Sequence, residues 1–185
     1  MAKGKLFVIS GASGVGKSTV LAQVMAKRGD LQFSVSATTR ASRPGETDGK
    51  DYYFITKDKF LAMIEAHDFL EYDAHMDNYY GTPKGQLEDK LQSGSVILDI
   101  EPNGAFHVRQ ESADAVLIFI APPSLEELER RLRSRGDTSE EQIRIRQERT
   151  LWEMEQSKHY DYVVVNDRVE ACAEEILNII AREAD

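Results

Sequence analysis

The stretch Gly11-Ala12-Ser13-Gly14-Val15-Gly16-Lys17-Ser18 (GASGVGKS) matches the pattern G-x-x-x-x-G-K-[ST] at every fixed position. Its glycines let the backbone turn its N–H groups inward, where they form a concave nest for phosphate oxygens. Lys17 supplies a positive charge for the β- and γ-phosphates, and Ser18 offers a hydroxyl to the coordination shell of Mg²⁺. The octapeptide therefore predicts a nucleotide-binding site.

The residues on either side of this phosphate loop support the same interpretation. An apolar run at 6–9 precedes it, and a helical pattern at 18–28 follows it. A helix that begins at the loop adds its N-terminal dipole and its free N–H groups to phosphate binding. The alternative is a glycine-rich turn that binds nothing, and the strand and helix around the motif argue against it.

Short β-branched runs alternate with longer helical patterns along most of the chain, which predicts βαβ units around a parallel sheet. We therefore expect an α/β fold with a doubly wound parallel sheet. Strands are expected at 5–10, 33–37, 95–100, 115–120 and 162–165, and helices at 18–28, 124–134, 139–157 and 168–183.

Two regions break the alternation. Residues 38–82 are rich in Thr, Arg, Gly, Asp and Tyr, and we interpret them as an inserted small lobe with strand-like pieces at 52–55 and 69–72 around a helix at 57–67. The polar stretch 135–139 between two charged helices is typical of a mobile lid. In doubly wound folds such insertions lie at the carboxyl ends of the strands, where ligands bind. The chain is thus expected to form one domain over 1–185, with a core at about 1–37, 83–134 and 158–185, a lobe at about 38–82 and a lid at about 135–157.

Composition narrows the function further. The 185 residues carry 23 basic and 32 acidic side chains, a net charge of −9, which disfavours a general nucleic-acid or acidic-membrane binder. Nine of the thirteen arginines fall in three short clusters, a distribution that suits a small polyanionic ligand. The alternative for Arg130, Arg133, Arg144 and Arg149 is helix-surface charge paired with nearby glutamates.

Location can be predicted from the same composition. The single cysteine, Cys172, permits no intramolecular disulfide and no cysteine metal cage. No apolar run approaches the roughly 20 residues that span a bilayer. The apolar run at 6–9 is too short for the core of a signal peptide. We expect a cytoplasmic protein.

The segments that follow the phosphate loop closely resemble those of guanylate kinases, in the same order and at the same spacing. These segments are S-x-T-T-R-x-x-R at 36–43, G-x-D-Y at 49–52, F-L-E at 69–71, N-Y-Y-G-T at 78–82 and I-L-D-I at 97–100, with further matches at 120–124, 131–136 and 165–167. The resemblance covers essentially the whole chain. It implies a phosphate-loop fold of the nucleoside-monophosphate kinase type that phosphorylates GMP, and also dGMP, with ATP and Mg²⁺, in purine nucleotide metabolism and GMP recycling.

The resemblance also implies roles for individual residues. Those expected to bind GMP are Ser36, Arg40, Arg43, Tyr52 and Tyr80 at the phosphate, and Glu71, Gly81, Thr82 and Asp99 at or near the base. Those expected to bind ATP are Gly11, Ala12, Ser13, Gly14, Val15, Gly16, Lys17, Ser18 and Thr19, together with the lid arginines Arg135 and Arg146. The expected catalytic residues are Lys17, Arg40, Arg135 and Arg146, and Mg²⁺ is assigned to Ser18, with Asp99 acting through water.

Elementary chemistry agrees with these assignments. Two arginines give forked donors for a phosphate monoester. A carboxylate such as Glu71 suits guanine, because N1–H and the 2-amino group are adjacent donors that it can accept together. Phosphoryl transfer needs positioning and charge neutralisation more than a protein nucleophile. We read the four histidines, which show no ligand spacing, as structural or surface residues: His67, His75, His107 and His159.

Two other functions deserve comparison. The first is a non-catalytic protein-interaction module of the same fold, which an intact phosphate loop and both lid arginines argue against. The second is a same-fold kinase of another phosphorylated metabolite, such as a ribose phosphate. Glu71 with Thr82 argues against that kinase, because a sugar substrate has no purine edge to read. The expected partners are the small molecules ATP and GMP, with no nucleic acid and no membrane, and the oligomeric state is not predicted.

Overall fold

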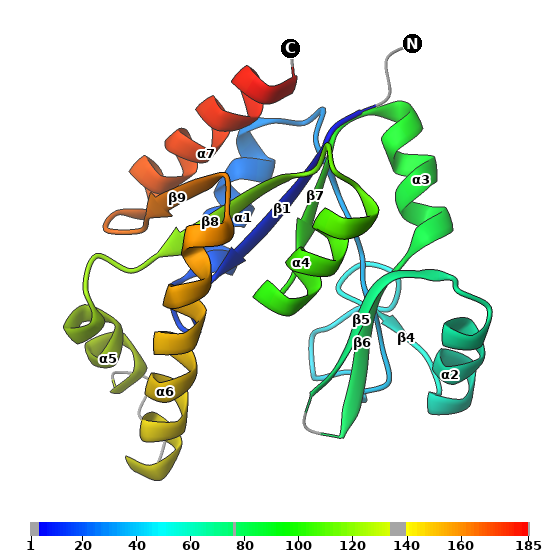
Figure 1. Cartoon of the computed structure of the whole chain (residues 1–185), viewed down its shortest axis with the longest axis horizontal. Coiled ribbons are helices and arrows are strands. Elements are labelled where there is room, and N and C mark those ends of the chain that lie inside the picture. Colours follow the sequence, from blue (N-terminus) through cyan, green and yellow to red (C-terminus); the bar gives the residue numbers. More distant parts are fainter. Residues whose placement is uncertain (1–3, 76, 134–139, 185) are drawn as a thin grey trace.

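The computed structural model describes residues 4–75, 77–133 and 140–184, and its centre is a parallel sheet (Figure 1). The five strands of this main sheet lie in the order β2-β7-β1-β8-β9. Their bounds are β1 Leu6–Gly11, β2 Gln32–Phe33, β7 Val96–Asp99, β8 Val116–Ala121 and β9 Tyr162–Val165. All four neighbouring pairs are parallel. The predicted fold class is confirmed.

Helices cover both faces of this sheet, which explains why its central strands are mostly apolar. α1 and α7 pack against each other on one face, and α4 packs against β1 on the other. All six residues of β8 are buried. The helices are α1 Lys17–Lys27, α3 Lys84–Ser93, α4 Pro102–Glu111, α5 Leu125–Arg133, α6 Glu140–Gln156 and α7 Val169–Ala184, with a 3₁₀ turn, η1, at Ser157–His159.

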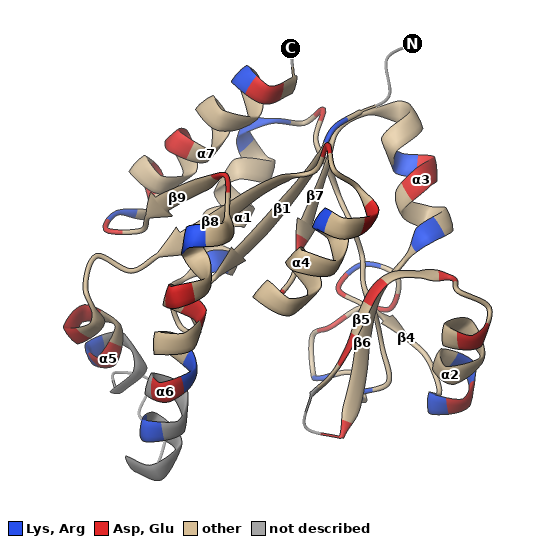
Figure 2. Cartoon of the chain, viewed as in Figure 1, with Lys and Arg blue, Asp and Glu red and all other residues tan. Residues whose placement is uncertain are grey.

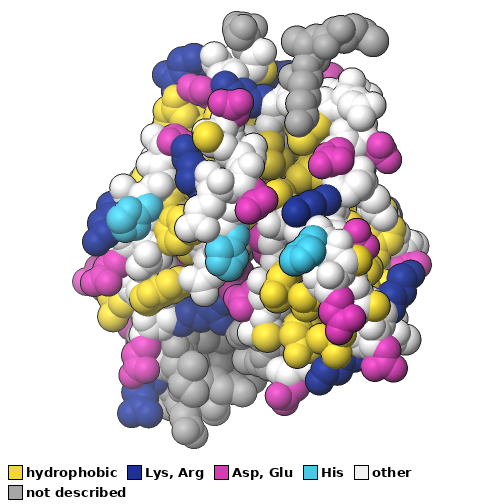
Figure 3. All heavy atoms as spheres, turned by 45° about the vertical axis from the view of Figure 1, so that its right-hand side comes forward, with side chains coloured by type: hydrophobic (Ala, Val, Ile, Leu, Met, Phe, Trp, Pro, Cys, Tyr) yellow, Lys and Arg dark blue, Asp and Glu magenta, His cyan; other side chains and the backbone are white. Residues whose placement is uncertain are grey.

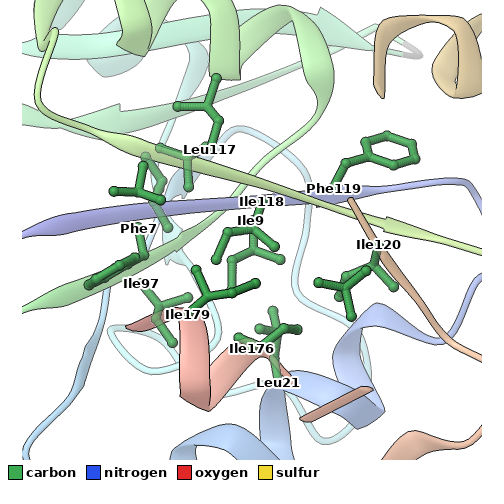
Figure 4. Close-up of a cluster of buried hydrophobic side chains, with 14 of the residues drawn as sticks. Phe7, Ile9, Leu21, Ile97, Leu117, Ile118, Phe119, Ile120, Ile176 and Ile179 are labelled. Atoms are coloured by element: carbon green, nitrogen blue, oxygen red, sulfur yellow. The ribbon is translucent and has the colours of Figure 1, made fainter. Parts of the chain in front are cut away.

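The hydrophobic core follows the alternation of side chains along the strands. On β8, Leu117 and Phe119 point to one side of the sheet, whereas Ile118 lies on the other side, toward Ile176 and Ile179 of α7 (Figure 4). The isoleucines of α7 recur at helical spacing and form its buried stripe. This packing fixes the positions of the central strands. It therefore also fixes the loops at their carboxyl ends.

A second, four-stranded sheet projects from the main sheet. Its strands lie in the order β4-β3-β6-β5, and β5 and β6 form an antiparallel hairpin. Its elements are β3 Ala37–Thr38, β4 Tyr53–Phe54, α2 Lys57–Glu65, β5 Phe69–His75 and β6 Asn78–Pro83. Phe60 of α2 stacks on Phe69 of β5 with ring centroids 4.3 Å apart, and these two rings centre a separate small core. The lobe therefore has its own packing.

The structure corrects the predicted strand at 33–37. Gln32–Phe33 pairs with β7 in the main sheet, whereas Ala37–Thr38 pairs with β4 and β6 in the small sheet. The stretch Phe33-Ser34-Val35-Ser36-Ala37 thus contributes to two sheets, and between them Ser34 N–H still donates to the carbonyl of Ile97 at 2.8 Å. The expectation failed because alternating apolar and polar residues predict an extended chain but do not reveal where it changes sheets.

Three further elements were not predicted. The hairpin strand β6 contains a glycine and a proline, α3 buries only two leucines, and α4 begins with proline and contains Gly104. These features weaken the local patterns on which the prediction depends. The predicted lid segment 135–139 lies outside the described residues. Among the residues that the structure describes, no helix is long and apolar enough to cross a membrane.

Candidate active site

The phosphate loop lies between the carboxyl end of β1 and the start of α1. Gly16 has φ +92°, a left-handed conformation that favours glycine, and it caps α1 without a side-chain hydrogen bond. Two side chains from distant segments hold the loop: Asn166 Nδ2 donates to the carbonyl of Val15 at 2.7 Å, and Ser13 N–H donates to Glu153 Oε2 at 2.8 Å. The loop is therefore shaped by the fold before any nucleotide binds.

Lys17 reaches from the first turn of α1 to the next strand. Its ammonium group forms an ion pair with Asp99, which ends β7, the neighbour of β1 in the main sheet. Ser18 and Thr19 lie beside it at the exposed start of α1. Lys17, predicted to bind phosphate, and Asp99, predicted to act near the metal ion, therefore lie together at the carboxyl ends of two parallel strands.

A cavity of about 320 Å³ opens next to this point, between the carboxyl ends of β1 and β7 and the small sheet. This volume lies at the lower end of the range for small-molecule sites. Six of the nine predicted GMP-binding residues line it: Ser36, Tyr52, Glu71, Tyr80, Gly81 and Asp99. Lys17 of the phosphate loop lines the same cavity. Four further lining residues were given no binding role from the sequence, namely Asp73, Ile100, Glu101 and Gly104.

Glu71 is the most buried charged group of this cavity, with only 6% of its surface exposed. Thr82, across the β5–β6 hairpin, donates its hydroxyl to Glu71 Oε1 at 2.6 Å. Burial raises the pKa of Glu71 to about 7, and the hydrogen bond from Thr82 opposes that rise. Glu71 and Thr82, assigned together to the base, therefore form one hydrogen-bonded unit, although Thr82 itself does not line the cavity.

Gly104 determines how closely α4 approaches this carboxylate. A Cβ atom at position 104 would stand 2.7 Å from Glu71 Oε2, closer than nonbonded atoms tolerate. Any side chain there would displace Glu71 or push α4 away from β5. The sequence carried only a weak signal for this contact, a glycine inside a helix that begins with proline.

Arg40 is held at the edge of the small sheet by a carboxylate that the sequence analysis did not single out. Its Nη1 and Nη2 atoms both donate to Glu46, each at 2.8 Å, and its guanidinium lies 5.2 Å from the centroid of the Tyr52 ring. The pair with Arg40 keeps the pKa of Glu46 at about 2. Glu46 also accepts from the backbone N–H of Arg43 at 2.7 Å, whereas Arg43 is largely exposed. Neither Arg40 nor Arg43 lines the cavity in this arrangement.

The lid side of the site is described only in part. Arg135 lies outside the described residues, and Arg146 lies in α6 with a side chain outside them. Arg149, one turn further along α6, pairs with both Glu101 and Glu153. The prediction of helix-surface charge holds for Arg130, which pairs with Glu127 one turn away, but Arg149 also joins α6 to the wall of the cavity.

Two further pockets among the described residues, one beside α3 and one where β8 begins, are lined by none of the predicted site residues. Acidic and basic residues are interspersed over the elements, without a broad basic face in this view (Figure 2). Histidine side chains on the face in Figure 3 lie apart from one another. Within the described ranges, no cluster of three or more His, Cys, Asp or Glu side chains could hold a metal ion by itself.

The fold and the site together define a class. A phosphate loop at the carboxyl end of β1 faces a cavity whose other wall is a separate small sheet carrying Tyr52, Glu71 and Tyr80. That arrangement is typical of phosphate-loop kinases of the nucleoside-monophosphate type, which hold a donor and an acceptor nucleotide on opposite sides of the transferred group.

Comparisons with known proteins identify the family. The family profile described as guanylate kinase matches residues 3–183. Guanylate kinase from Synechococcus sp. (strain JA-3-3Ab) is 47% identical over 175 residues, covering 94% of this chain and 81% of the relative. Guanylate kinase from Lactococcus lactis subsp. lactis is 47% identical over 182 residues, covering 98% of this chain and 89% of the relative. The chain belongs to the guanylate kinase family.

A solved structure agrees with these sequence matches. The crystal structure of guanylate kinase from Anaplasma phagocytophilum superposes with a TM-score of 0.81 at 35% identity, covering 99% of this chain and 87% of that one. The similarity therefore includes the phosphate loop, the small sheet and the helices that join them.

Proposed function

We propose that this protein transfers the γ-phosphoryl group of ATP to the 5′-phosphate of GMP, giving ADP and GDP, and that it also accepts dGMP. One observation carries the proposal: Lys17 of the phosphate loop and the buried carboxylate of Glu71 line the same cavity. The first group suits a triphosphate, and the second suits the adjacent N1–H and 2-amino donors of guanine. Family membership over residues 3–183 supports the same reaction.

The residues on the acceptor side have distinct tasks in this reaction. Glu71, oriented by Thr82, accepts the donors of the guanine edge. Tyr52 and Tyr80, whose rings meet nearly edge-on with centroids 6.1 Å apart, form the wall on the side of the acceptor phosphate. When the small sheet closes on the acceptor phosphate, Arg40 supplies a planar guanidinium to it. Until then, Glu46 holds the guanidinium through two hydrogen bonds.

On the donor side, Lys17 must exchange partners. The ion pair with Asp99 holds its ammonium group at the junction of the two sites, and the phosphates of ATP compete for the same charge. An oxygen of the GMP phosphate attacks the γ-phosphorus of ATP while the bond to the β–γ bridging oxygen breaks, so no protein nucleophile is required. Arg135 and Arg146 are assigned to the charge that develops on the transferred group.

Mg²⁺ completes the proposed site. Its usual ligands are hard oxygens, and in kinases it is held by one or two protein groups together with the substrate phosphates. The Ser18 hydroxyl, next to Lys17 in the chain, would hold the ion, and the Asp99 carboxylate, which pairs with Lys17, would act on it through a bound water. Bound there, Mg²⁺ would neutralise phosphate charge. A cytoplasmic location stays a prediction from the sequence.

A coupled assay of ADP formation tests this function. Purified protein is supplied with ATP, Mg²⁺ and one of AMP, GMP, CMP or UMP as acceptor. The expected result is rapid ADP formation with GMP alone. ADP formation with none of the four would favour the interaction module, and formation with a sugar phosphate instead would favour the same-fold kinase.

A further inference from the structure

A buried carboxylate on α6 holds the phosphate loop from behind. Glu153 is only 2% exposed and does not line the acceptor cavity. Its Oε2 atom accepts from the backbone N–H of Ser13 at 2.8 Å, and its Oε1 atom accepts from Arg149 Nε at 3.1 Å. Because Ser13 and Glu153 are 140 residues apart, this contact ties the loop to the far end of the chain.

Burying a charged carboxylate costs free energy of desolvation, which other interactions of Glu153 must offset. Burial raises the pKa of Glu153, and the bonds from Ser13 and Arg149 oppose that rise. Buried ion pairs are weak evidence for stability, because apolar residues of similar volume often stabilise a fold equally well. A charged acceptor aimed at one backbone N–H does something that an apolar residue cannot, since it fixes the position of that peptide group.

Arg149 explains how the charge is tolerated close to a phosphate site. It lies between Glu153 and Glu101, pairs with both, and so compensates their negative charge close to the phosphate loop. Glu101 lines the acceptor cavity. The anchor, defined as Glu153 with Arg149, therefore touches the donor loop at one end and the acceptor cavity at the other.

We infer that Glu153 and Arg149 are positioning residues for ATP: Glu153 holds the phosphate loop at Ser13 in the shape that receives the phosphates, and Arg149 neutralises and orients that carboxylate. The inference rests on the proposed function, because it takes the ligand of the loop to be ATP. It also assigns the Ser13 amide to the anchor rather than to the phosphates, which refines the ATP-binding role predicted for Ser13.

The chain offers a matched control for this anchor. Arg109 pairs with Asp161 at 2.5 Å, and Asp161 in turn accepts from the backbone N–H of Leu117 at 2.8 Å. An arginine, a carboxylate and a backbone amide are again linked, and the side-chain exposure of Arg109, 36%, is close to the 33% of Arg149, whereas Asp161 is 37% exposed and Glu153 3%. This second anchor lies where β8 begins, away from the phosphate loop.

Calorimetric titration with the non-hydrolysable analogue AMPPNP and Mg²⁺ measures the effect, with GMP titrated separately. Glu153→Ala should weaken AMPPNP binding by about tenfold or more and GMP binding by less than threefold. Glu153→Gln should weaken AMPPNP less, because its amide oxygen still accepts from Ser13. Arg149→Gln should weaken AMPPNP by about tenfold, since it leaves the carboxylate uncompensated behind the loop. Arg109→Gln should stay within twofold of the parent.

The double variant Arg149→Gln/Glu153→Gln separates positioning from general loosening. If Arg149 acts by compensating Glu153, the double variant should bind AMPPNP better than Arg149→Gln alone. Additive losses, AMPPNP binding within twofold of the parent in Glu153→Ala, or equal losses for GMP and AMPPNP would overturn the inference. Thermal unfolding identifies variants that do not fold. If Glu153→Ala does not fold, the comparison of Arg149→Gln, Glu153→Gln and their double variant still tests the inference. Should the parent bind AMPPNP but phosphorylate no nucleoside monophosphate, the proposed function fails while this test stands.

Discussion

Replacing Glu71 with glutamine tests base selection at the residue that the structure buries most deeply among the charged groups of the cavity. Thr82 already donates to Oε1 at 2.6 Å, so the remaining lone pairs of the carboxylate are available to guanine. An amide at this position keeps one acceptor but turns an NH₂ group toward a donor of the base. Hydrogen bonds to charged groups contribute about 1.5–3 kcal/mol each. Losing one and opposing it with a donor costs about 3 kcal/mol, or roughly 10²-fold in kcat/KM for GMP.

The parent protein should discriminate among acceptors in a fixed order. AMP presents an acceptor at N1 and no 2-amino group, so it leaves the buried carboxylate unpaired. Sites of this kind reject such analogues by roughly 10⁴-fold. IMP keeps N1–H and lacks only the 2-amino group, so its kcat/KM should fall between those of GMP and AMP. Glu71→Gln should compress this order mainly by lowering the value for GMP.

The assay is coupled ADP formation with GMP, IMP and AMP at pH 8, where the Glu71 carboxyl, with a pKa of about 7, is largely ionised. Asp73→Asn is the matched control, because Asp73 lies two residues along the same strand and lines the same cavity. It should preserve the order of the three acceptors. If the parent uses AMP within tenfold of GMP, or if Glu71→Gln leaves the order unchanged, Glu71 does not read the base.

Four further outcomes are expected. GMP affinity should fall by up to tenfold per pH unit below about 7, because guanine binds the ionised form of Glu71; Glu71→Gln, titrated in parallel, should remove this component. In the ligand-free protein the same raised pKa means that the fold keeps a proton which the unfolded chain loses between pH 4.5 and about 7. The free energy of unfolding, measured with urea, should therefore contain a component that declines with rising pH in this window and is absent in Glu71→Gln. Lys17→Ala should lower turnover by at least about 10²-fold with little change in unfolding temperature, and turnover within threefold of the parent would contradict its catalytic role. Crystal structures with and without GMP should show residues 38–82 closer to the phosphate loop in the complex, and an identical arrangement in both would exclude closure.

The local sequence pattern predicted the main sheet because each strand and helix carries its own periodicity. The apolar run of β8 is buried on both faces, and α7 repeats isoleucines at helical spacing. Both elements can therefore be predicted from their own residues, without information about the elements that pack on them. The same reasoning failed at 33–37, where one run supplies β2 to one sheet and β3 to another. A strand pattern predicts that a segment will join a sheet, but tertiary packing determines which strand it pairs with.

The candidate site divides along the same line. The sequence alone determined the phosphate loop, because eight consecutive residues contain both the conformational freedom and the charge that phosphate binding needs. Its likeness to a family located Glu71 and Arg40. Only the tertiary structure revealed that Gly104 leaves room for Glu71 and that Glu153 holds Ser13. These contacts join residues that are 33 and 140 positions apart, so they arise from the packing of α4 against β5 and of α6 against the phosphate loop, which no local pattern encodes.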